Sequence, residues 1–239
     1  MVSEVVSLFN RMHVLVIGPG LGRCPLVFQA TAKIITAAIE QNIPLVIDAD
    51  GLFLLTKEPY RNILLGYENV VLTPNVVEMK RLIETADIQN DDESKESSSD
   101  SIGTLSKVIL GNILVRKGKH DIISSIVAPS EEGNELTEIK MECKEEGGLK
   151  RSGGIGDVLS GTMGAFVAWN SILSKGRDTA QKKQNLILSC WSACCLTKKA
   201  TRAAFQKNRR SMTAPDILEE IGSVFDTMTR YKDEFEDSK

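Results

Sequence analysis

The chain has 239 residues, a formal net charge of −3, 42% hydrophobic residues and 26% charged residues. This composition is ordinary for a globular protein with one large domain, and it lacks the basic excess that is typical of nucleic-acid binding. No apolar run approaches the roughly 20 residues that a helix needs to cross a bilayer, so we expect no membrane partner. The stretch Met1–Met12 has neither a signal-peptide pattern nor a transit-peptide pattern, and the cytoplasm is therefore the expected compartment.

The five cysteines do not indicate a metal site. No two of them have the C-x-x-C spacing that is common among zinc ligands. Cys190 and Cys194 are one helical turn apart in an apolar segment. We expect them to be reduced residues of the core.

Strand and helix signals alternate in the first half of the chain. Short β-branched runs predict strands, and apolar residues at helical spacing predict the helices between them. The predicted strands are His13–Ile17, Leu45–Ile47, Val70–Leu72, Ile113–Val115 and Ile122–Val127, and the predicted helices are Pro25–Gln41 and Val76–Ala86. Pro25 falls in the first turn of one helix, and Asn75 is a suitable N-cap for the other. Continuous apolar strands between helices indicate an α/β fold with a mostly parallel central sheet and helices on both faces.

The C-terminal third contains helix signals with little strand between them. The predicted helices are Asp157–Trp169, Asn185–Phe205 and Pro215–Arg230, which we expect to form a helical layer on the sheet. Residues 89–101 are nearly all Asp, Glu, Ser, Lys and Asn, and we interpret them as a disordered insertion in preference to a regulatory segment that acts through its serines. The segment Glu131–Gly148 is also polar, and we expect it to contain a loop over the site.

Polar motifs follow the predicted strands. These motifs are Gly18–Gly22, Asp48–Gly51, Thr73–Glu78 and Lys117–Asp121. Ligands of such sheets bind at the carboxyl ends of the strands. The sequence therefore predicts a binding site at that edge of the sheet.

The first two motifs leave alternatives open. The spacing of Gly18–Gly22 is G-x-G-x-G with Pro19 inside it, whereas a dinucleotide fingerprint has G-x-G-x-x-G. We therefore favour a glycine-rich pocket wall over a Rossmann cofactor site or a tight turn without a ligand. Asp48 and Asp50 could hold magnesium through water, or they could equally cap a turn before Leu52.

The other two motifs are also open to two interpretations. In Lys117–Asp121, a lysine could meet nucleotide phosphates and Asp121 could bind a ribose hydroxyl, but a plain β-turn would look the same. His120 has no visible catalytic partner, and we assign it no catalytic role. The polar face of Asn75–Arg81 suits recognition of a polar ligand, although an exposed helix face would have a similar pattern.

The segment Arg151–Asp157, with the sequence RSGGIGD, is the most informative part of the chain. Its glycines allow a ligand to approach the backbone, and the apolar run Val158–Trp169 predicts a helix that starts there. The free N–H groups and the positive end of that helix suit a phosphate. Because a phosphate would repel a carboxylate, we expect Asp157 to act on an incoming hydroxyl. Both the G-x-x-x-x-G-K-[ST] motif and the protein-kinase motifs are absent, so the segment predicts phosphoryl transfer to an alcohol on another scaffold.

Taken together, the motifs resemble the ATP- or ADP-dependent NAD(P)H-hydrate dehydratases of the ribokinase-like superfamily, and the pattern is similar to the eukaryotic, ATP-using branch. The matching strings, in the order of that family, are VIGPGLGR (Val16–Arg23), PLVIDADGL (Pro44–Leu52), LTPNVVEMKRL (Leu72–Leu82), VRKGKHD (Val115–Asp121) and KRSGGIGDVLSG (Lys150–Gly161). The resemblance implies a single ribokinase-like domain over residues 1–239. The implied reaction is a repair: ATP phosphorylates the hydroxyl that hydration has added to NADH or NADPH, and phosphate then leaves.

The resemblance also implies roles for residues. Asp157 would accept the hydroxyl proton, and the amides near Gly154 and Gly156 would stabilise the transferring phosphoryl group, with Mg²⁺ on the ATP phosphates. The substrate would be held by Gly20, Gly22, Asn75, Val76, Val77, Glu78, Met79, Lys80, Arg81 and Asp157. ATP would be held by Lys117, Gly118, Lys119, His120, Asp121, Gly147, Gly148, Leu149, Lys150, Arg151, Ser152, Gly153, Gly154, Ile155 and Gly156. A functional link to an NAD(P)HX epimerase and a homo-oligomeric state are further expectations, and no residue is assigned as a dedicated metal ligand.

Two departures from the family pattern affect these expectations. Ile155 stands where family members usually have glutamine, which keeps the backbone donors and loses a polar side chain. The family also has an N-terminal portion that no segment before Met12 matches, so we expect a truncated domain with an exposed sheet edge near His13–Ile17. The alternatives are a small-molecule hydroxyl kinase of the same superfamily and a catalytically impaired nucleotide-binding isoform.

Overall fold

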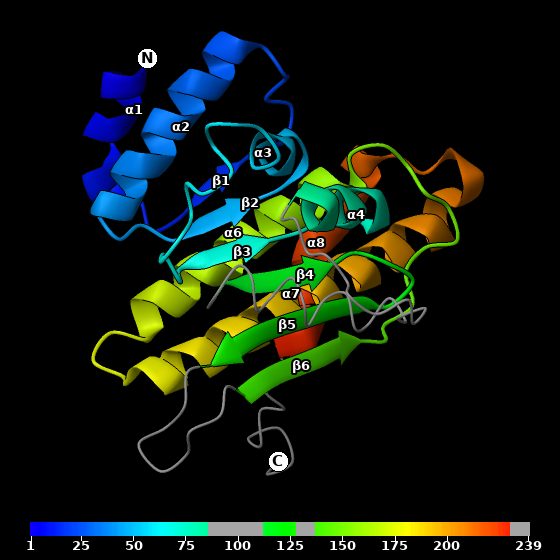
Figure 1. The fold of residues 1–239 in the computed structure, drawn as a ribbon. Coiled ribbons are helices and arrows are strands. Elements are labelled where there is room, and N and C mark those ends of the chain that lie inside the picture. Colours follow the sequence, from blue (N-terminus) through cyan, green and yellow to red (C-terminus); the bar gives the residue numbers. More distant parts are fainter. Residues whose placement is uncertain (86–111, 128–136, 230–239) are drawn as a thin grey trace, which may run out of the picture.

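A computed structural model describes residues 1–85, 112–127 and 137–229 (Figure 1). The predicted insertion at residues 89–101 lies outside the described residues. The described part of the chain forms a six-stranded sheet in the order β1-β2-β3-β4-β5-β6. The strands are β1 (Leu15–Ile17), β2 (Leu45–Ile47), β3 (Val70–Leu72), β4 (Ile113–Arg116), β5 (Asp121–Val127) and β6 (Thr137–Cys143). Strands β1 to β4 are parallel, and β5 and β6 are added to them in antiparallel pairing, which confirms a mostly parallel sheet.

Helices cover both faces of the sheet, as predicted (Figure 1). The helices are α1 (Val2–Ser7), η1 (Phe9–Arg11), α2 (Pro25–Glu40), α3 (Ala49–Leu54), α4 (Val76–Thr85), α6 (Ile155–Leu173), α7 (Thr179–Asn208), η2 (Arg209–Ser211) and α8 (Ala214–Thr229). Helices α2, α3 and α4 pack on one face, and α6 and α7 pack on the other. Helix α8 packs against α6 and α7, so the C-terminal third is helical.

Alternation along the central strands divides the core into two layers. On β2, Leu45 and Ile47 face the α2 side, whereas Val46 faces α6 and α7, and all three residues are completely buried. Successive side chains of a strand point to opposite faces, so a strand between two helical layers must be apolar at every position. This requirement explains why β2 and β3 are continuous apolar runs in the sequence.

The segment Glu131–Gly148, which we predicted to contain a loop over the site, contains both a strand and a loop. Residues Thr137–Cys143 form β6, which was not predicted and pairs with β5 at the edge of the sheet, whereas Lys144–Gly148 form an irregular segment that lines the cavity described below. Ile139 and Met141 pack on the core, and Glu138, Lys140 and Glu142 are exposed. A half-buried edge strand has this period of two, and the exposed charges give the segment a polar average composition that hides the pattern.

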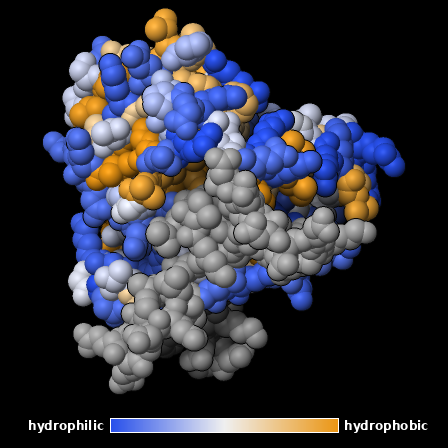
Figure 2. All heavy atoms as spheres, in the orientation of Figure 1, coloured by the Kyte–Doolittle hydropathy of each residue, from blue (hydrophilic) through white to orange (hydrophobic). Residues whose placement is uncertain are grey.

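Strand β1 lies at the opposite edge of the sheet from β6, which confirms the predicted edge at His13–Ile17 with a shorter strand. Cys143, Cys190, Cys194 and Cys195 are buried, and all five cysteines are free, which confirms Cys190 and Cys194 as core thiols. Within the described ranges, no helix has the length and apolar character needed to span a membrane. The face drawn in Figure 2 is largely hydrophilic, with hydrophobic residues gathered over its upper half.

Candidate functional site

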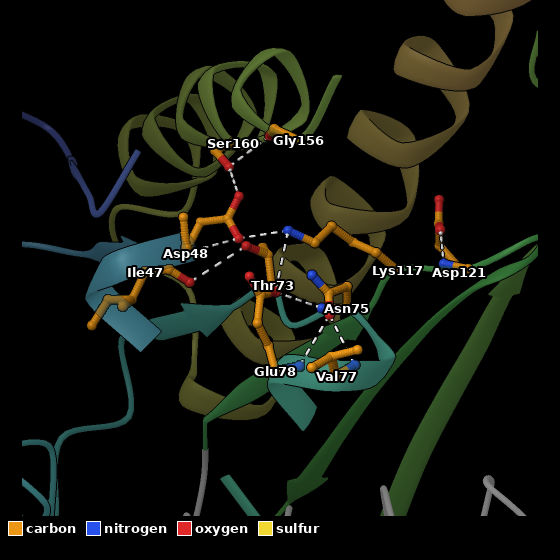
Figure 3. Close-up of polar contacts among 12 residues, drawn as sticks. Ile47, Asp48, Thr73, Asn75, Val77, Glu78, Lys117, Asp121, Gly156 and Ser160 are labelled. Atoms are coloured by element: carbon orange, nitrogen blue, oxygen red, sulfur yellow. Dashed lines mark hydrogen bonds and ion pairs between the residues drawn. The ribbon is translucent and has the colours of Figure 1, made fainter. Parts of the chain in front are cut away.

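Three segments meet at the carboxyl ends of the parallel strands, as the sequence predicts. Lys117 follows β4, and its Nζ lies 2.6 Å from Oδ1 of Asp48, which follows β2 (Figure 3). Ser160 on α6 donates to the other carboxylate oxygen of Asp48, and its hydroxyl is also 2.9 Å from the carbonyl oxygen of Gly156. A Cβ atom on Gly156 would lie 3.7 Å from Lys117 Nζ and 3.8 Å from Asp48 Oδ2. The ion pair of Asp48 and Lys117 therefore lies directly beside the first turn of α6.

In addition to its ion pair with Lys117, Asp48 caps helix α3. Its carboxylate accepts a hydrogen bond from the Ala49 amide at 2.8 Å and so caps α3, and its residue exposure is only 1%. Ala49 has a φ of +47°, a left-handed conformation that costs a non-glycine residue about 1–3 kcal/mol. The turn-capping alternative for Asp48 is therefore what the structure shows.

Asp50 fastens the glycine-rich loop Gly18–Gly22. Its carboxylate accepts a hydrogen bond from the Gly22 amide at 3.1 Å and one from Arg23 Nε at 2.8 Å. The guanidinium of Arg23 also stacks on the ring of Phe53, 4.1 Å from the ring centroid. Both aspartates of this motif thus have partners in the protein, and the described residues contain no group of three or more His, Cys, Asp or Glu that could hold a metal ion.

Helix α6 begins at Ile155 with an uncapped N-terminus. Gly154 is the N-cap residue, has a φ of +87°, and provides no side chain to bind the first amides. A Cβ atom at Gly154 would lie 2.8 Å from Cβ of Ala214, so the position requires glycine for space as well as for conformation. The first intrahelical bond runs from the Val158 amide to the Gly154 carbonyl, which leaves the preceding helical amides free to bind an anion.

Asp157 is exposed in that first turn and makes no hydrogen bond or ion pair with any other described residue. It directly follows Gly156, which lines a cavity of about 720 Å³. A volume of this size is within the range of small-molecule sites, roughly 300–1,000 Å³. We call it the strand-end cavity. Asp157 itself is not among the residues that line it.

The strand-end cavity joins the two segments predicted to hold ATP. Its walls include Lys117, Gly118, Lys119, His120, Asp121, Gly147, Gly148, Leu149, Lys150, Arg151, Ile155 and Gly156 from those predictions. Ser152, Gly153 and Gly154 do not line it. Lys144, Glu145 and Glu146, from the segment predicted to contain a loop over the site, also line it. Leu159, Thr197, Lys198 and Thr201 complete the walls and were not predicted.

The turn Lys117–Asp121 is held by Lys198 of α7. Lys198 Nζ donates to the carbonyl oxygens of Gly118 at 3.1 Å and Lys119 at 2.7 Å, and it lies 3.4 Å from Asp121 Oδ2. The Gly118 amide donates to the other oxygen of Asp121 at 2.9 Å. Burial raises the pKa of the Asp121 carboxyl, and the Gly118 hydrogen bond and the Lys198 charge oppose that rise. Asp121 therefore shapes the turn, and a lysine 77 positions further along the chain holds it in place.

The glycine pair at Gly147 and Gly148 passes close to α7. The Gly148 amide donates to Thr201 Oγ1 at 3.1 Å, and a Cβ atom on Gly148 would lie 2.6 Å from the Thr201 carbonyl oxygen. Further along, Lys150 Nζ donates to the Met212 carbonyl at 2.7 Å. These contacts hold the segment before α6 against α7 and against the chain that leads into α8.

Some of the residues predicted to hold the substrate make contacts within the fold, and others are exposed at the surface. Asn75 Oδ1 accepts from the amides of Val77 at 2.9 Å and Glu78 at 3.0 Å, and the Asn75 amide donates to Glu78 Oε2 at 2.7 Å. This capping box confirms Asn75 as the N-cap of α4. Val76 and Val77 are 61% and 58% exposed, whereas Met79 is buried in the core, so the Met79 side chain does not face a ligand.

The other substrate candidates lie at the surface. Gly20 and Gly22 are exposed in the glycine loop, and Lys80 forms a surface pair with Glu84 at 3.8 Å. Arg81 and Glu78 share a small hollow of about 20 Å³ with Arg23, which follows the glycine loop. The structure therefore brings Arg23, at the end of the glycine loop, close to the first turns of α4.

The fold defines the class of protein. Solved structures that are similar over most of the chain are ribokinase-like α/β proteins. A hypothetical protein from Streptococcus mutans has a TM-score of 0.67 and 21% identity over 96% of this chain and 71% of its own. Hydroxyethylthiazole kinase from Pyrococcus horikoshii OT3 has a TM-score of 0.63 and 16% identity over 93% of this chain and 75% of its own, and a ribokinase from Giardia lamblia has a TM-score of 0.53 and 13% identity over 95% and 63%. At these identities the likeness shows the fold alone, which confirms the predicted ribokinase-like architecture.

Sequence comparison identifies the family. Residues 1–223 match the family model described as NAD(P)H-hydrate dehydratase, and the chain belongs to this family. The ATP-dependent (S)-NAD(P)H-hydrate dehydratase of Neurospora crassa is 38% identical over 230 residues, which cover 93% of this chain and 62% of that protein. The enzymes of the same name from Rattus norvegicus and Homo sapiens are 38% and 36% identical over 225 residues, covering 94% of this chain and 60% of each enzyme. The chain thus spans about 60% of the length of these curated relatives.

Proposed function

We propose that this chain catalyses the ATP-dependent dehydration of (S)-NADHX or (S)-NADPHX to NADH or NADPH, with release of ADP and phosphate. The relatives are named for this activity. In this chain, the proposal depends on the geometry at the start of α6. The uncapped N-terminus of α6 contributes Ile155 and Gly156 to the wall of the strand-end cavity, and the exposed carboxylate of Asp157 belongs to the same first turn. An acceptor for a hydroxyl proton and a cradle for a phosphoryl group are therefore carried by one helical turn.

Asp157 would accept the proton of the substrate hydroxyl and orient its oxygen toward the γ-phosphate. The free amides that follow Gly154, including that of Gly156, would stabilise the negative charge of the transferring phosphoryl group. Lys117 adds a positive charge beside this turn, although Asp48 neutralises part of it. The carboxylate would act on the nucleophile, and the amides would act on the phosphoryl group.

ATP would occupy the strand-end cavity between Lys117–Asp121 and Gly147–Gly156. The hydrated dinucleotide would approach from the other side of α6, along Gly20, Gly22 and Asn75–Arg81. Arg23 and Arg81, which share the small hollow beside the glycine loop, would meet its phosphates. Asn75 and Glu78 would contribute mainly by fixing the start of α4, because their side chains are used in the capping box.

Magnesium is part of the proposal as the counter-ion of ATP. Mg²⁺ commonly binds through one or two carboxylates and the phosphates of a substrate. The carboxylates that line the strand-end cavity already have cationic partners, Asp121 with Lys198, Glu145 with Lys199 and Glu146 with Arg202, and the nearby Asp48 is paired with Lys117. These residues fit an ion that arrives with the nucleotide and is held mainly by its phosphates, where it neutralises phosphate charge.

ATP has a chemical purpose in this reaction. Hydroxide is a poor leaving group, whereas phosphate leaves readily once the hydroxyl oxygen carries the phosphoryl group. Loss of phosphate together with a ring proton restores the nicotinamide ring. The chain's own contribution is to position the hydroxyl and to stabilise the phosphoryl group during its transfer.

The direct test is to incubate the purified chain with NADHX, ATP and magnesium and to follow the return of NADH absorbance together with free phosphate. We expect both products to appear in equal amounts. A stable phosphorylated product without NADH would indicate a hydroxyl kinase, and ATP binding without turnover would indicate a nucleotide-binding subunit. Either result would contradict the proposal.

We also propose that an NAD(P)HX epimerase supplies the S epimer, that the chain acts in the cytoplasm, and that it assembles as a homo-oligomer. A coupled assay tests the first of these, because added epimerase should allow complete repair of a mixture of R and S epimers. Light scattering on the purified chain tests the oligomer.

A further inference from the structure

A second cavity, of about 560 Å³, lies at the opposite end of the sheet, beside the residues that enter β2 and β3. We call it the lysine cavity. Its walls are Asn42, Pro44, Gly66, Tyr67, Glu68, Asn69, Val167, Asn170, Ser171, Ser174, Lys175, Thr179, Lys182, Lys183 and Leu186. None of these residues belongs to the strand-end cavity or to the proposed reaction, so this inference does not rest on the proposed function.

The charge of the lysine cavity is positive. Lys175, Lys182 and Lys183 face it together with one carboxylate, that of Glu68, which gives three positive charges against one negative charge, or +2. Among the described residues, none of the three lysines has a carboxylate within ion-pair distance. Asp178, the N-cap of α7, is not among the residues that line the cavity, and its carboxylate accepts a hydrogen bond from the Gln181 amide. A net charge of +2 is complementary to a phosphate group, which carries about −1.5 to −2 at neutral pH.

Lys183 is the unusual member of this group. Its exposure is only 8%, and within the described residues its ammonium group makes one hydrogen bond, a long one of 3.4 Å to the Glu68 carbonyl oxygen. Burial lowers the pKa of Lys183, and the charge of Glu68 opposes this effect. A buried ammonium without a close anion is costly, and such groups are normally paired. An anion in the cavity would supply the missing partner and would favour the charged form of Lys183.

The polar groups around the lysines suit a hydrated, oxygen-rich ligand. Asn69 donates to Asn42 at 2.7 Å, and Ser174 donates to Asn170 at 3.0 Å. Tyr67 is not available to a ligand, because its hydroxyl donates to the Ile43 carbonyl at 2.6 Å. The volume is sufficient for a molecule larger than phosphate itself, and it lies within the range of metabolite sites, roughly 300–1,000 Å³.

The two cavities are connected by the same two helices. The C-terminal part of α6 and the N-terminal part of α7 line the lysine cavity, whereas the N-terminus of α6 and the later part of α7 line the strand-end cavity. A ligand in the lysine cavity therefore contacts the same two helices that form the strand-end cavity, and a close-packed core transmits strain between such contacts.

We propose that the lysine cavity is a second ligand site that binds a small phosphorylated metabolite, with Lys183 as the buried partner of its phosphate group. The probe is inorganic phosphate, titrated into the ¹⁵N-labelled chain at constant ionic strength and followed by ¹H–¹⁵N correlation spectra. We expect saturable shifts of the amides of residues 171–175 and 179–183, in addition to shifts of the amides of residues 153–157 at the start of α6.

In the Lys183→Met variant, the phosphate affinity measured from the shifts of residues 171–183 should fall by about tenfold or more, because a charge-assisted hydrogen bond is lost. The affinity measured from residues 153–157 should be unchanged. Lys33→Met, which changes an exposed lysine of α2, is the matched control and should leave both sets as they are. If Lys183→Met does not fold, the double variant of Lys175→Met and Lys182→Met, both exposed positions, should weaken the same set. Absence of saturable shifts at residues 171–183 in the wild-type chain, shifts that persist in the lysine variants, or an equal response to acetate would overturn the proposal.

Discussion

Helices α4 and α6 both begin at the carboxyl end of the parallel strands, but their first turns are occupied differently. The free amides of α4 are bound by its own side chains, Asn75 and Glu78, in a reciprocal capping box. Helix α6 begins after Gly154, which has no side chain to offer, and its first amides have no such partner. An N-terminus that the protein caps for itself contributes to stability, and one that it leaves open is available to an external anion.

The same contrast applies to the acidic residues of the two helices. Glu78 is half-buried and lies 3.8 Å from Lys117, so its charge belongs to the network of Asp48 and Lys117. Asp157 is exposed without a partner among the described residues. A carboxylate without a partner in the fold is free to take part in chemistry. We therefore assign the reaction to the start of α6 and a structural role to the start of α4.

The largest expected effect is that of Asp157→Asn. The amide cannot accept the hydroxyl proton, so NADHX turnover should fall by about 10²–10⁴-fold. The ATP affinity should stay within about tenfold, or 1.4 kcal/mol, because the helix amides are unchanged. Turnover with NADHX and calorimetry with ATP measure the two quantities. Asp178→Asn, an exposed aspartate at the start of α7, should keep its turnover, and retained turnover in Asp157→Asn would remove this residue from the mechanism.

The Asp48→Asn substitution should cause the next largest effect, a loss of about 3 kcal/mol in the free energy of unfolding, because it leaves the mostly buried ammonium of Lys117 without its close partner. Urea unfolding followed by circular dichroism measures the change. In the control, Glu84→Gln breaks the exposed pair of Lys80 and Glu84 and should cost less than about 1 kcal/mol. Equal losses in the two variants would mean that the pair of Asp48 and Lys117 contributes no more than a surface pair.

The Gly156→Ala substitution should raise the free energy of unfolding and lower the ATP affinity. The new Cβ would be in ordinary contact with Lys117 and Asp48, so the fold should accept Gly156→Ala and gain about 0.5–1 kcal/mol from the loss of a helical glycine. The methyl group would lie beside Lys117, on the turn where the proposal places the phosphate, and the ATP affinity should fall by about tenfold, or 1.4 kcal/mol. Gly161→Ala, on the exposed side of α6 with no atom within 4 Å of its Cβ, should give the same gain in stability without a loss of affinity. An unchanged ATP affinity in Gly156→Ala would show that phosphate does not approach this turn.

The smallest expected effect is that of Asn75→Ala. Removing the cap of α4 should lower the free energy of unfolding by about 1 kcal/mol and should leave the ATP affinity unchanged. Asn75→Asp restores a side-chain acceptor and should recover most of the loss in thermal unfolding experiments. A change in ATP affinity in Asn75→Ala would contradict the separation between the two helix starts.

Several features were predictable because their signals are local. The apolar runs that form β2 and β3 were predicted with the bounds that the structure shows, and Asn75 was predicted as the cap of α4 from its position before an apolar helical pattern. The start of α6 was predicted from its glycines within two residues of Ile155. The edge strand β6 was missed, because its apolar residues alternate with charged ones and do not form the continuous apolar run of the buried strands.

The site was only partly predictable for a different reason. Most segments that line the strand-end cavity were found from their motifs, but Lys198 and Thr201 were not. They lie within α7, and the apolar pattern of a helix indicates which residues are buried but not which other segments they contact. The two possibilities for Asp48 were equal in the sequence, and its contacts with Lys117 and Ser160 decided for a structural role. The lysine cavity had no sequence signal, since its lysines look like ordinary surface residues.

The amino-acid sequence by itself determined the alternation of strands and helices, the glycine-rich helix start and the family resemblance. These depend on periodicity and on capping within a few residues of the chain. Only the tertiary structure decided which charges are neutralised and where cavities remain. The ion pair of Asp48 with Lys117 joins residues 69 positions apart, and the bond from Lys183 to Glu68 joins residues 115 positions apart. Such contacts form when packed elements bring distant segments together, and no local pattern specifies their distance.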